Sequence, residues 1–476
     1  MNLNQTLQEK YPHLEVSVLK LSEVKKNIDF RIDDSFWTMK LIYNNKLNYK
    51  KIGECLLKSQ YGISINMNEG GDGIPIYRMN DIDNMLCNFE VKKYALIDKN
   101  ELQTFRLNYG DVLFNRTNSY EFVGRTGIFY NNRENFVFAS YLVRLVCNKE
   151  ILLPEYLTVF LNTHIGKKEI RRRARPSINQ TNVNPEELKE IKIPIFPMEF
   201  QLEIQNLVKD SHKALEESKE LYKKAEETLY LELGLDSKNP LQSLLDSKTN
   251  NPTKSLNISI RTLKESFLKT GRLDSEYYQS KYEDIEKFIK SYPNGYDSFS
   301  NIINNKDTNF TPKNNENYSY IELANIGNNG NISEPISDLG KNLPTRARRI
   351  VSKGDVIISS IEGSLSSCAL ITQEFDKHLV STGFFVLNSK LLNGETLLVM
   401  FKSQIFQEYL KKFPSGTILC AINKEELSKI LIPKIDSTTQ EKIAKYIQES
   451  FNLRKKSKQL LDNAKNKVEE QIQGKT

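Results

Sequence analysis

The sequence is poor in residues that hold metal ions. Its 476 residues include five cysteines and four histidines. The cysteines stand far apart with no C-x-x-C pair, and neither an H-E-x-x-H motif nor a Cys/His cluster occurs. Zinc sites need such groups at close spacing, so the common zinc motifs are excluded. An odd number of scattered cysteines also predicts reduced, buried thiols rather than a disulfide framework.

Motifs of the main catalytic classes are also missing. No G-x-x-x-x-G-K-[ST] phosphate loop occurs, because Asn342 follows Gly340-Lys341 where serine or threonine is required. No Asn/Asp-Pro-Pro-aromatic tetrad of an amino-methyltransferase is present. Glu190-x-Lys192 resembles part of a metal-dependent nuclease motif, but a second segment of the same pattern, KEELSKIL, lacks both residues. We therefore expect a binding protein that is not an enzyme and holds no metal or cofactor of its own.

Long apolar runs are absent as well. No segment approaches 18 consecutive apolar residues, and the N-terminal MNLNQTLQEKYPHLE has no apolar core of a signal peptide. These absences predict a cytoplasmic protein that is neither secreted nor membrane-spanning. The net charge of +7 is compatible with a polyanionic partner, but only clustered charge would point to one.

What the sequence does contain is a long internal repeat. GDVLFNRT at residue 110 returns as GDVIISSI 244 residues later, and PIYRMNDI and SYIELANI keep the same offset. Arg31 in FRIDDSF matches Arg272 in GRLDSEY, 241 residues later, and PEELKEIKIP matches KEELSKILIP with an offset of 239. Four anchors in one order predict a tandem duplication with copies of roughly 240 residues. The alternative is that unrelated strands share a common short sequence such as Gly-Asp-Val.

Each copy ends in a long charged segment with apolar or small residues at 3-4 spacing. Such spacing predicts an amphipathic helix, and small residues on its seam let two helices approach closely. An isolated helix of this kind needs a partner, and we expect the two to pair antiparallel. Two separate oligomerisation helices are the alternative. The seam positions are Ile204, Val208, Ser211, Leu215, Ser218, Tyr222, Ala225 and Leu229 in the first helix, and Ile443, Ile447, Ser450, Arg454, Ser457, Leu461, Ala464 and Val468 in the second.

The strand-like runs before each long helix predict an α/β fold in each copy. The expected organisation is one globular domain over residues 1–198 and a second over 256–436. Long helices follow over 199–235 and 437–476, and a polar linker with two prolines spans 236–255.

Basic clusters are the positive evidence for nucleic acid, because lysine and arginine meet phosphates. The first copy has KKEIRRRARP, and the second has TRARRIVSK and a lysine pair. A solvated charged face is the alternative for any single cluster. The predicted phosphate-binding residues are Arg171, Arg172, Arg173 and Arg175 in the first copy, and Arg346, Arg348, Arg349, Lys411 and Lys412 in the second.

Two polar loops of the first copy offer side chains that can read bases. Asparagine and glutamine pair with adenine, and arginine pairs with guanine. The alternative is a surface hairpin with ordinary turn residues. The predicted residues are Asn115, Arg116, Thr117, Asn118 and Arg125 in one loop and Asn179, Gln180 and Asn182 in the other, with Ser359 and Thr417 in the second copy. The second copy keeps the sequence around the first loop but has SSIEGSLSS in place of the loop itself. This divergence suits two domains that read different sequences, and drift in a neutral loop is the alternative.

Taken together, these sequence segments resemble those of the specificity subunit of a type I restriction-modification system. The resemblance rests on GDVLFNRTNSYEFVGRTGIF, INQTNVNPEELKEIKIPIFPMEFQ, GDVIIS and INKEELSKILIP, and covers nearly the whole chain. Its most specific element is Ile-Pro, a short gap and a glutamine, Gln201 and Gln440, at the start of each long helix. IPKIDSTTQ departs from the usual pattern by lacking a second proline.

The resemblance implies two target-recognition domains that each read half of a bipartite, asymmetric DNA site. It also implies two methyltransferase subunits on the helices and two motor-nuclease subunits in the complete complex. S-adenosylmethionine, ATP and Mg²⁺ would then lie on those partners. The alternatives are a DNA-binding regulator or scaffold that bridges two DNA sites without a methyltransferase, and a single-chain enzyme, which the missing motifs disfavour.

Overall fold

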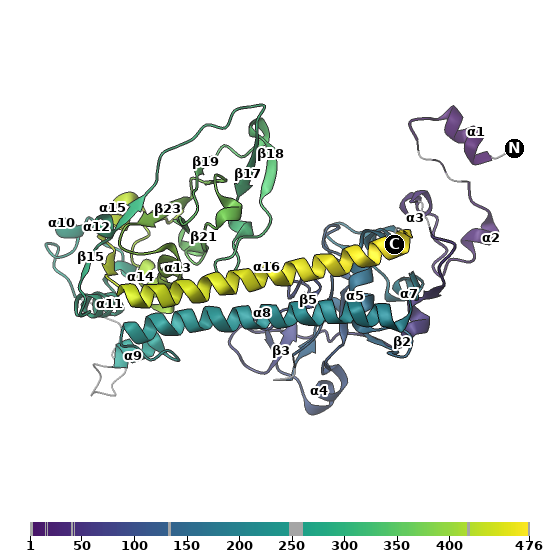
Figure 1. Cartoon of the computed structure of the whole chain (residues 1–476), viewed down its shortest axis with the longest axis horizontal. Coiled ribbons are helices and arrows are strands. Elements are labelled where there is room, and N and C mark those ends of the chain that lie inside the picture. Colours follow the sequence, from purple (N-terminus) through teal and green to yellow (C-terminus); the bar gives the residue numbers. More distant parts are fainter. Residues whose placement is uncertain are drawn as a thin grey trace. The chain divides into compact units, whose positions relative to one another are not determined.

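The computed structural model describes residues 3–474 except 15, 17, 40, 42, 132–134, 247–259 and 417–418. The chain forms two compact units. The first unit comprises Met1–Leu215 and Lys455–Thr476, and the second comprises Glu216–Arg454. Each long helix contributes one stretch to each unit (Figure 1).

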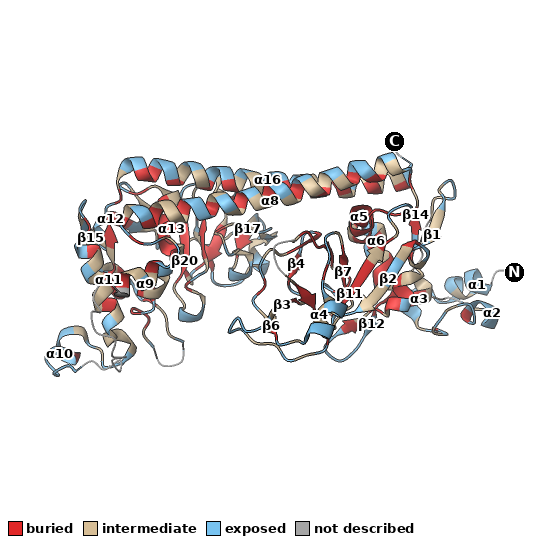
Figure 2. Cartoon of the chain, turned by 90° about the horizontal axis from the view of Figure 1, so that it is seen from below, coloured by how far each residue is buried: buried red, intermediate tan, exposed pale blue. Residues whose placement is uncertain are grey.

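The first unit is built on a six-stranded sheet. Apolar β7 and β11 pair antiparallel at its centre, with Val112 opposite Leu145. Helix α5 begins at Pro154, whose fixed φ suits the first turn, and it is buried along almost its whole length (Figure 2). The sheet order is β2 (Leu56–Tyr61), β11 (Leu142–Cys147), β7 (Val112–Asn115), β9 (Thr126–Ile128), β5 (Leu86–Cys87) and β4 (Ile82–Asp83), and the helices that follow are α5 (Pro154–Asn162), α6 (His164–Arg173) and α7 (Pro185–Lys189).

The second unit repeats this core in reduced form. Its central strands β20 and β23 pair antiparallel, with Val356 opposite Leu387 as Val112 is opposite Leu145. A second sheet has four strands and packs beside its own apolar cluster, in the order β18 (Ile336–Leu339), β17 (Asn317–Ile321), β22 (Leu379–Ser381) and β19 (Ala347–Ile350). The main elements are β16 (Ile303–Asn305), β23 (Phe384–Ser389), β20 (Val356–Ser359), β21 (Cys368–Leu370), α13 (Gly394–Lys402), α14 (Gln404–Leu410) and α15 (Lys424–Lys429).

The repeated Gly-Asp-Val has a structural reason in both copies. Gly110 and Gly354 have φ of 90° and 88°, which glycine adopts without a steric cost. The buried carboxylates of Asp111 and Asp355 accept a hydrogen bond from the backbone amide three residues earlier, at 2.9 and 2.8 Å. This turn directly precedes β7 in the first copy and β20 in the second, so the Gly-Asp-Val motif marks the start of the central strand.

The two long helices are α8 (Met198–Glu232) and α16 (Ser437–Gln473). In the first unit Ser211 Oγ lies 2.8 Å from Ser457 Oγ, and in the second Ser218 Oγ lies 2.9 Å from Ser450 Oγ. Because residue numbers rise on one helix as they fall on the other, the pairing is antiparallel. The predicted α/β tandem duplication with paired long helices is confirmed, and all predicted seam positions are buried or half-buried.

Each long helix is fixed at its start by the predicted glutamine. Gln201 Oε1 accepts a hydrogen bond from the Leu153 amide at 2.9 Å, and its Nε2 donates to the carbonyls of Ile151 and Phe196. Gln440 makes the same three contacts in the second copy, to the Asn393 amide and the carbonyls of Leu391 and Ile435. The glutamine therefore satisfies three backbone groups where the helix leaves the domain.

The segment predicted as a linker is partly helical. Helix α9 (Pro240–Asp246) begins at a proline and buries Leu244 in the apolar core of the second unit. The spacing of apolar residues in PLQSLL accounts for this short amphipathic helix. The rest of the predicted linker, residues 247–255, lies outside the described residues. Among the helices that the structure describes, none is long and apolar enough to cross a membrane.

Candidate nucleic-acid interface

A three-stranded sheet joins the two loops of the first copy that the sequence singles out. Its order is β12 (Arg175–Pro176), β13 (Thr181–Asn182) and β8 (Thr117–Asn118). Asn182 lies opposite Thr117, and Thr117 Oγ1 donates to Asn182 Oδ1 at 2.5 Å. Loops that are more than sixty residues apart in the chain thus form one surface of the first unit.

The tip of the β12–β13 hairpin is the most accessible part of this surface. Ser177, Asn179 and Gln180 are exposed, and Ile178 is 97% exposed. The Ser177 amide donates to the Gln180 carbonyl at 2.6 Å, which closes the turn. Amide side chains held on a closed turn can enter a groove and pair with a base edge.

Other predicted reading residues are buried. Asn115 is fully buried at the end of β7, where its backbone exchanges hydrogen bonds with Gly124 and Arg125. Thr117 is 3% exposed and bonds Asn182. A buried side chain offers no edge to a base, so their burial argues against direct base contact. Both instead hold the loop in shape, a role that the polar sequence pattern could not distinguish from reading.

Three arginines of the first copy lie over exposed or half-buried aromatic rings. Arg116 lies 5.1 Å from the ring centre of Tyr61, Arg125 4.1 Å from Phe122, and Arg171 5.8 Å from Tyr120. Such stacking keeps a guanidinium extended and ordered without cancelling its charge. Arg171 is exposed, while Arg116 and Arg125 are half-buried. Asn118, also half-buried, accepts a hydrogen bond from the Ser119 amide.

The rest of the Arg171–Arg175 cluster serves the fold. Arg172 donates to the Phe36 carbonyl at 2.6 Å, and burial lowers its pKa. Arg173 is buried and pairs with Glu169 in the preceding turn. For Arg175, burial acts to lower the pKa, but Glu187 and Asp29 outweigh it and raise the pKa. Of the four predicted phosphate-binding arginines, Arg171 and Arg175 are exposed, and Arg175 is paired with Asp29 and Glu187.

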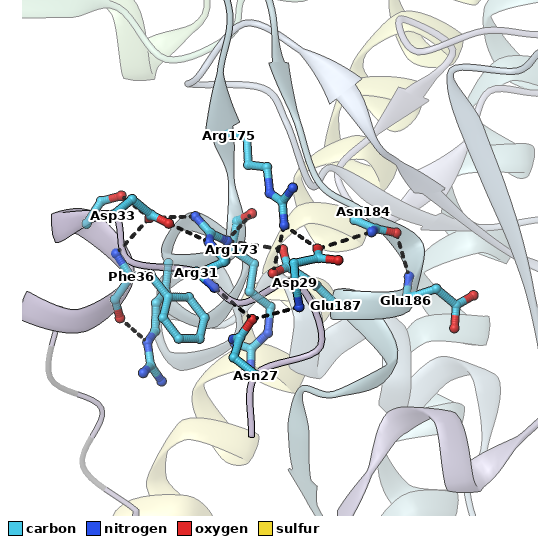
Figure 3. Close-up of polar contacts among 12 residues, drawn as sticks. Asn27, Asp29, Arg31, Asp33, Phe36, Arg173, Arg175, Asn184, Glu186 and Glu187 are labelled. Carbon is cyan, nitrogen blue, oxygen red and sulfur yellow. Dashed lines mark hydrogen bonds and ion pairs between the residues drawn. The ribbon is translucent and has the colours of Figure 1, made fainter. Parts of the chain in front are cut away.

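Arg173 and Arg175 lie beside an ion cluster centred on the buried Arg31 (Figure 3). Arg31 Nε and Nη2 each donate to Asp33 at 2.7 Å, and Nη1 donates to Glu187 at 3.1 Å and to the Arg173 carbonyl at 2.9 Å. Residues 31, 173 and 187 come from three separate segments. The cluster therefore ties the N-terminal segment to the base of the hairpin and to α7.

The second copy has the same cluster around Arg272. It donates to both oxygens of Asp274, at 2.8 and 2.7 Å, and to the carbonyls of Phe413 and Pro414. Its second carboxylate, Glu426, lies at 4.0 Å. The predicted Lys412 is buried and pairs with Glu286, whereas Lys411 is exposed and pairs with Glu408 at 2.7 Å.

The three-stranded sheet has a counterpart in the second copy as isolated bridges. Ile361 pairs with Ala421, and Ala421 pairs with Ser415. Ser359, like Asn115 at the end of its central strand, is buried and bonds Ser364 at 2.8 Å. The predicted Thr417 lies outside the described residues.

The remaining predicted arginines of the second copy lie on or beside β19 (Ala347–Ile350). Arg346 is exposed, and its carbonyl accepts a hydrogen bond from the Thr382 amide. Arg348 donates to the Thr345 carbonyl at 2.7 Å. Arg349 bonds the Phe384 carbonyl, and burial lowers its pKa. Of the three, Arg346 is the most accessible.

Sequence reasoning missed the aromatic side of this surface. Tyr61 and Tyr120 are about half exposed and lie beneath arginines, and Ile178 forms the hairpin tip. Aromatic residues close to basic ones in a predicted loop could have indicated Tyr120, but Tyr61 is far from Arg116 in the sequence. Among the described residues, no group of three or more His, Cys, Asp or Glu side chains is placed to hold a metal ion.

Comparison with known proteins gives consistent matches. Residues 64–227 match the family model of the type I restriction modification DNA specificity domain. A protein of Methanocaldococcus jannaschii described as a type I restriction enzyme MjaX specificity subunit is 22% identical over 415 residues, which are 86% of this chain and 88% of that protein. The type I restriction enzyme EcoKI specificity subunit of Escherichia coli is 27% identical over 161 residues, about a third of each chain.

Solved structures are similar over a greater length. The S subunit of a type I restriction-modification system from M. genitalium is 14% identical, with a TM-score of 0.42 over 90% of this chain and 96% of that one. The resemblance seen in the sequence is confirmed by the family model and the curated relatives. Residues 64–227 thus match the type I restriction modification DNA specificity domain, and the chain is similar to curated specificity subunits of such systems.

Proposed function

We propose that this chain is the non-catalytic DNA-specificity subunit of a type I restriction-modification complex, and that each copy reads one half of a bipartite, asymmetric site. The observation that carries the proposal is the β8–β13–β12 sheet, which joins both polar loops of the first copy and presents the exposed hairpin tip. The second copy has isolated β-bridges in the place of this sheet. They support a second reading surface with a similar backbone arrangement but different side chains.

In the first copy, Asn179 and Gln180 are the base-reading side chains, because their amides are exposed on a closed turn. Arg171 and Arg116 meet the phosphates beside them, ordered by the rings of Tyr120 and Tyr61. Asn115 and Thr117 hold the loop from within.

In the second copy, Arg346 and Lys411 are the accessible cations, and Thr417 is proposed to contact DNA from the sequence pattern alone. Arg348, Arg349 and Lys412 are occupied by contacts within the fold. The two copies therefore offer different chemical surfaces to DNA, as two different half-sites require.

The domain boundaries that we propose are 1–198 and 256–436 for the recognition domains, with helices over 199–235 and 437–476 as the spacer. A helix of 35 residues, the length of α8, is about 50 Å long. The half-sites themselves would face the protein roughly one DNA helical turn apart. Two methyltransferase subunits would dock on the helices, two motor-nuclease subunits would join them, and S-adenosylmethionine, ATP and Mg²⁺ would be bound there.

Modified-base sequencing tests this function. The chain is co-expressed with the methyltransferase subunit of its own system in a host that lacks other adenine methylation. We expect a bipartite N6-methyladenine motif that disappears when the chain is omitted. If the methyltransferase is expressed and assembled but no chain-dependent motif is found, the proposal fails and a regulator or scaffold becomes the better interpretation.

A further inference from the structure

The hairpin tip of the first copy carries an apolar side chain whose presence the fold does not explain. Ile178 is 97% exposed, which is the largest exposed fraction of any large apolar residue in the described part of the chain. An apolar side chain stabilises a fold through the surface that it removes from water, and Ile178 removes almost none. Its contribution therefore comes from a contact outside the chain.

The turn itself gives no reason for an isoleucine. Gly, Asn, Asp and Ser are the usual turn residues, because they tolerate unusual dihedral angles or bond the local backbone. β-branched side chains favour strands, where they pack against their neighbours. This turn is closed through the backbone, by the hydrogen bond from the Ser177 amide to the Gln180 carbonyl. The turn therefore does not set the identity of the side chain at Ile178.

Polar side chains surround Ile178 on this surface. Asn179 and Gln180 follow it directly and are exposed, and Arg116 directly precedes β8 of the same sheet. In the major groove, amides pair with adenine, and thymine presents its C5-methyl group, whereas the minor groove presents no methyl group. An aliphatic side chain that enters the major groove beside two amides finds its apolar partner in a thymine methyl group.

The second copy also has an exposed aliphatic residue in the corresponding loop. The bridge between Ser415 and Ala421 closes this loop, and Leu419 within it is 66% exposed. No asparagine or glutamine occurs between Ser415 and Ala421, so the amides of the first copy have no counterpart there. An exposed aliphatic side chain is therefore common to two loops whose polar residues differ.

From the exposed tip and its polar neighbours, we propose that Ile178 reads a thymine through contact with its C5-methyl group in the major groove. This inference rests on the proposed DNA-specificity function and names one base that the first copy requires. The half-site of the first copy then contains a thymine beside the positions that Asn179 and Gln180 read. Ile178 contributes specificity without a hydrogen bond, because a base that lacks the methyl group leaves the side chain without its apolar partner.

Replacing thymine with deoxyuridine tests this contact, because the exchange removes the methyl group and keeps the base pair. Duplexes with the motif found by modified-base sequencing are made with each thymine of either strand replaced in turn. Fluorescence anisotropy measures their binding to the chain assembled with its methyltransferase. We expect at least one replacement in one half of the motif to weaken binding by about fourfold, the value of one buried methyl-sized group.

Ile178→Ala should remove that penalty. The variant should bind the thymine duplex about fourfold more weakly than wild type and should no longer distinguish it from the deoxyuridine duplex. Leu57→Ala is the matched control, because Leu57 is 70% exposed but lies on β2, outside the three-stranded sheet. This control should keep the wild-type preference for thymine.

Three results would overturn this inference: no thymine replacement weakens binding, the penalty persists in Ile178→Ala, or Leu57→Ala loses it equally. Weaker assembly of Ile178→Ala with the methyltransferase, measured by size-exclusion chromatography, would also overturn it and assign the tip to a protein interface. In each case the wild-type complex still binds its motif, so the proposed function stands. Absence of motif-specific binding by the assembled wild-type complex would instead contradict the proposed function itself.

Discussion

The two copies share the arginine and glutamine contacts that hold each domain together, and they differ in their exposed loops. Arg31 and Arg272 each form a bidentate hydrogen bond with the aspartate two residues later. Each also donates to backbone carbonyls near the end of its domain. Gln201 and Gln440 each satisfy three backbone groups at the start of a long helix. These contacts hold the frame in both copies and are kept where the sequences around them have diverged, although the bonds from Arg272 to Asp274 are exposed.

The exposed loops show the opposite behaviour. The first copy has a β12–β13 hairpin with Asn179 and Gln180 at its tip, whereas the second has isolated bridges in the same place. In this molecule the frame is duplicated and the contacts available to a ligand are specific to each copy.

The Arg31 cluster gives the largest expected difference between the copies. Arg31→Ala leaves Asp33 without its partner and leaves the buried Glu187 with Arg175 alone, and should destabilise the first unit by about 3 kcal/mol. Arg272→Ala should cost about 2 kcal/mol, because Asp274 is 45% exposed and Glu426 is 4.0 Å away. Hydrogen exchange, followed separately in each unit, measures both losses. Equal losses would contradict the ranking.

Loss of the glutamine at the start of each long helix should destabilise both copies to the same extent. Gln201→Ala and Gln440→Ala each remove three hydrogen bonds to backbone groups, at about 1 kcal/mol each, and should cost about 2–3 kcal/mol. Urea unfolding, with hydrogen exchange to assign the transition to a unit, checks this expectation. A large loss for one variant and none for the other would break the equivalence.

Glu226 on α8 predicts a pH dependence that belongs to the second unit. Burial raises its pKa to about 7, although Lys402 acts to lower it. Since ionisation is then disfavoured in the folded state, stability should be highest below pH 4.5 on this account and should fall as the pH rises through 7. Glu226→Gln should flatten this slope and raise the melting temperature at pH 8 by about 2 °C. An unchanged pH slope would contradict this assignment.

The serine pairs on the helix seam should show the smallest effect. Ser211→Ala alone leaves Ser457 buried without its partner and should cost about 1 kcal/mol. The double variant S211A/S457A should recover most of this loss, because both polar groups are removed together. A double-mutant cycle measures the coupling, and the Ser218–Ser450 pair provides the matched comparison.

Periodic and local features could be predicted from the sequence. The seam from Ile204 to Leu229 is defined by 3-4 spacing, and Gly110-Asp111 marks a turn by its own chemistry. Distant pairings could not be predicted, since nothing local shows that Thr117 lies opposite Asn182 or that Arg172 donates to the Phe36 carbonyl. The sequence marked Arg31 only as a residue of the internal repeat. Its role in the ion cluster could not be predicted, because its partners come from separate segments of the chain.

The exposed hairpin tip offers the most direct test of the central claim that each copy reads its own half-site. Modified-base sequencing is carried out with the N179A/Q180A variant assembled with its methyltransferase. Losing base contacts worth about 1–3 kcal/mol each should relax the sequence in one half of the methylated motif and leave the other half unchanged. An unchanged motif, or equal relaxation of both halves by a folded and assembled variant, would contradict the account.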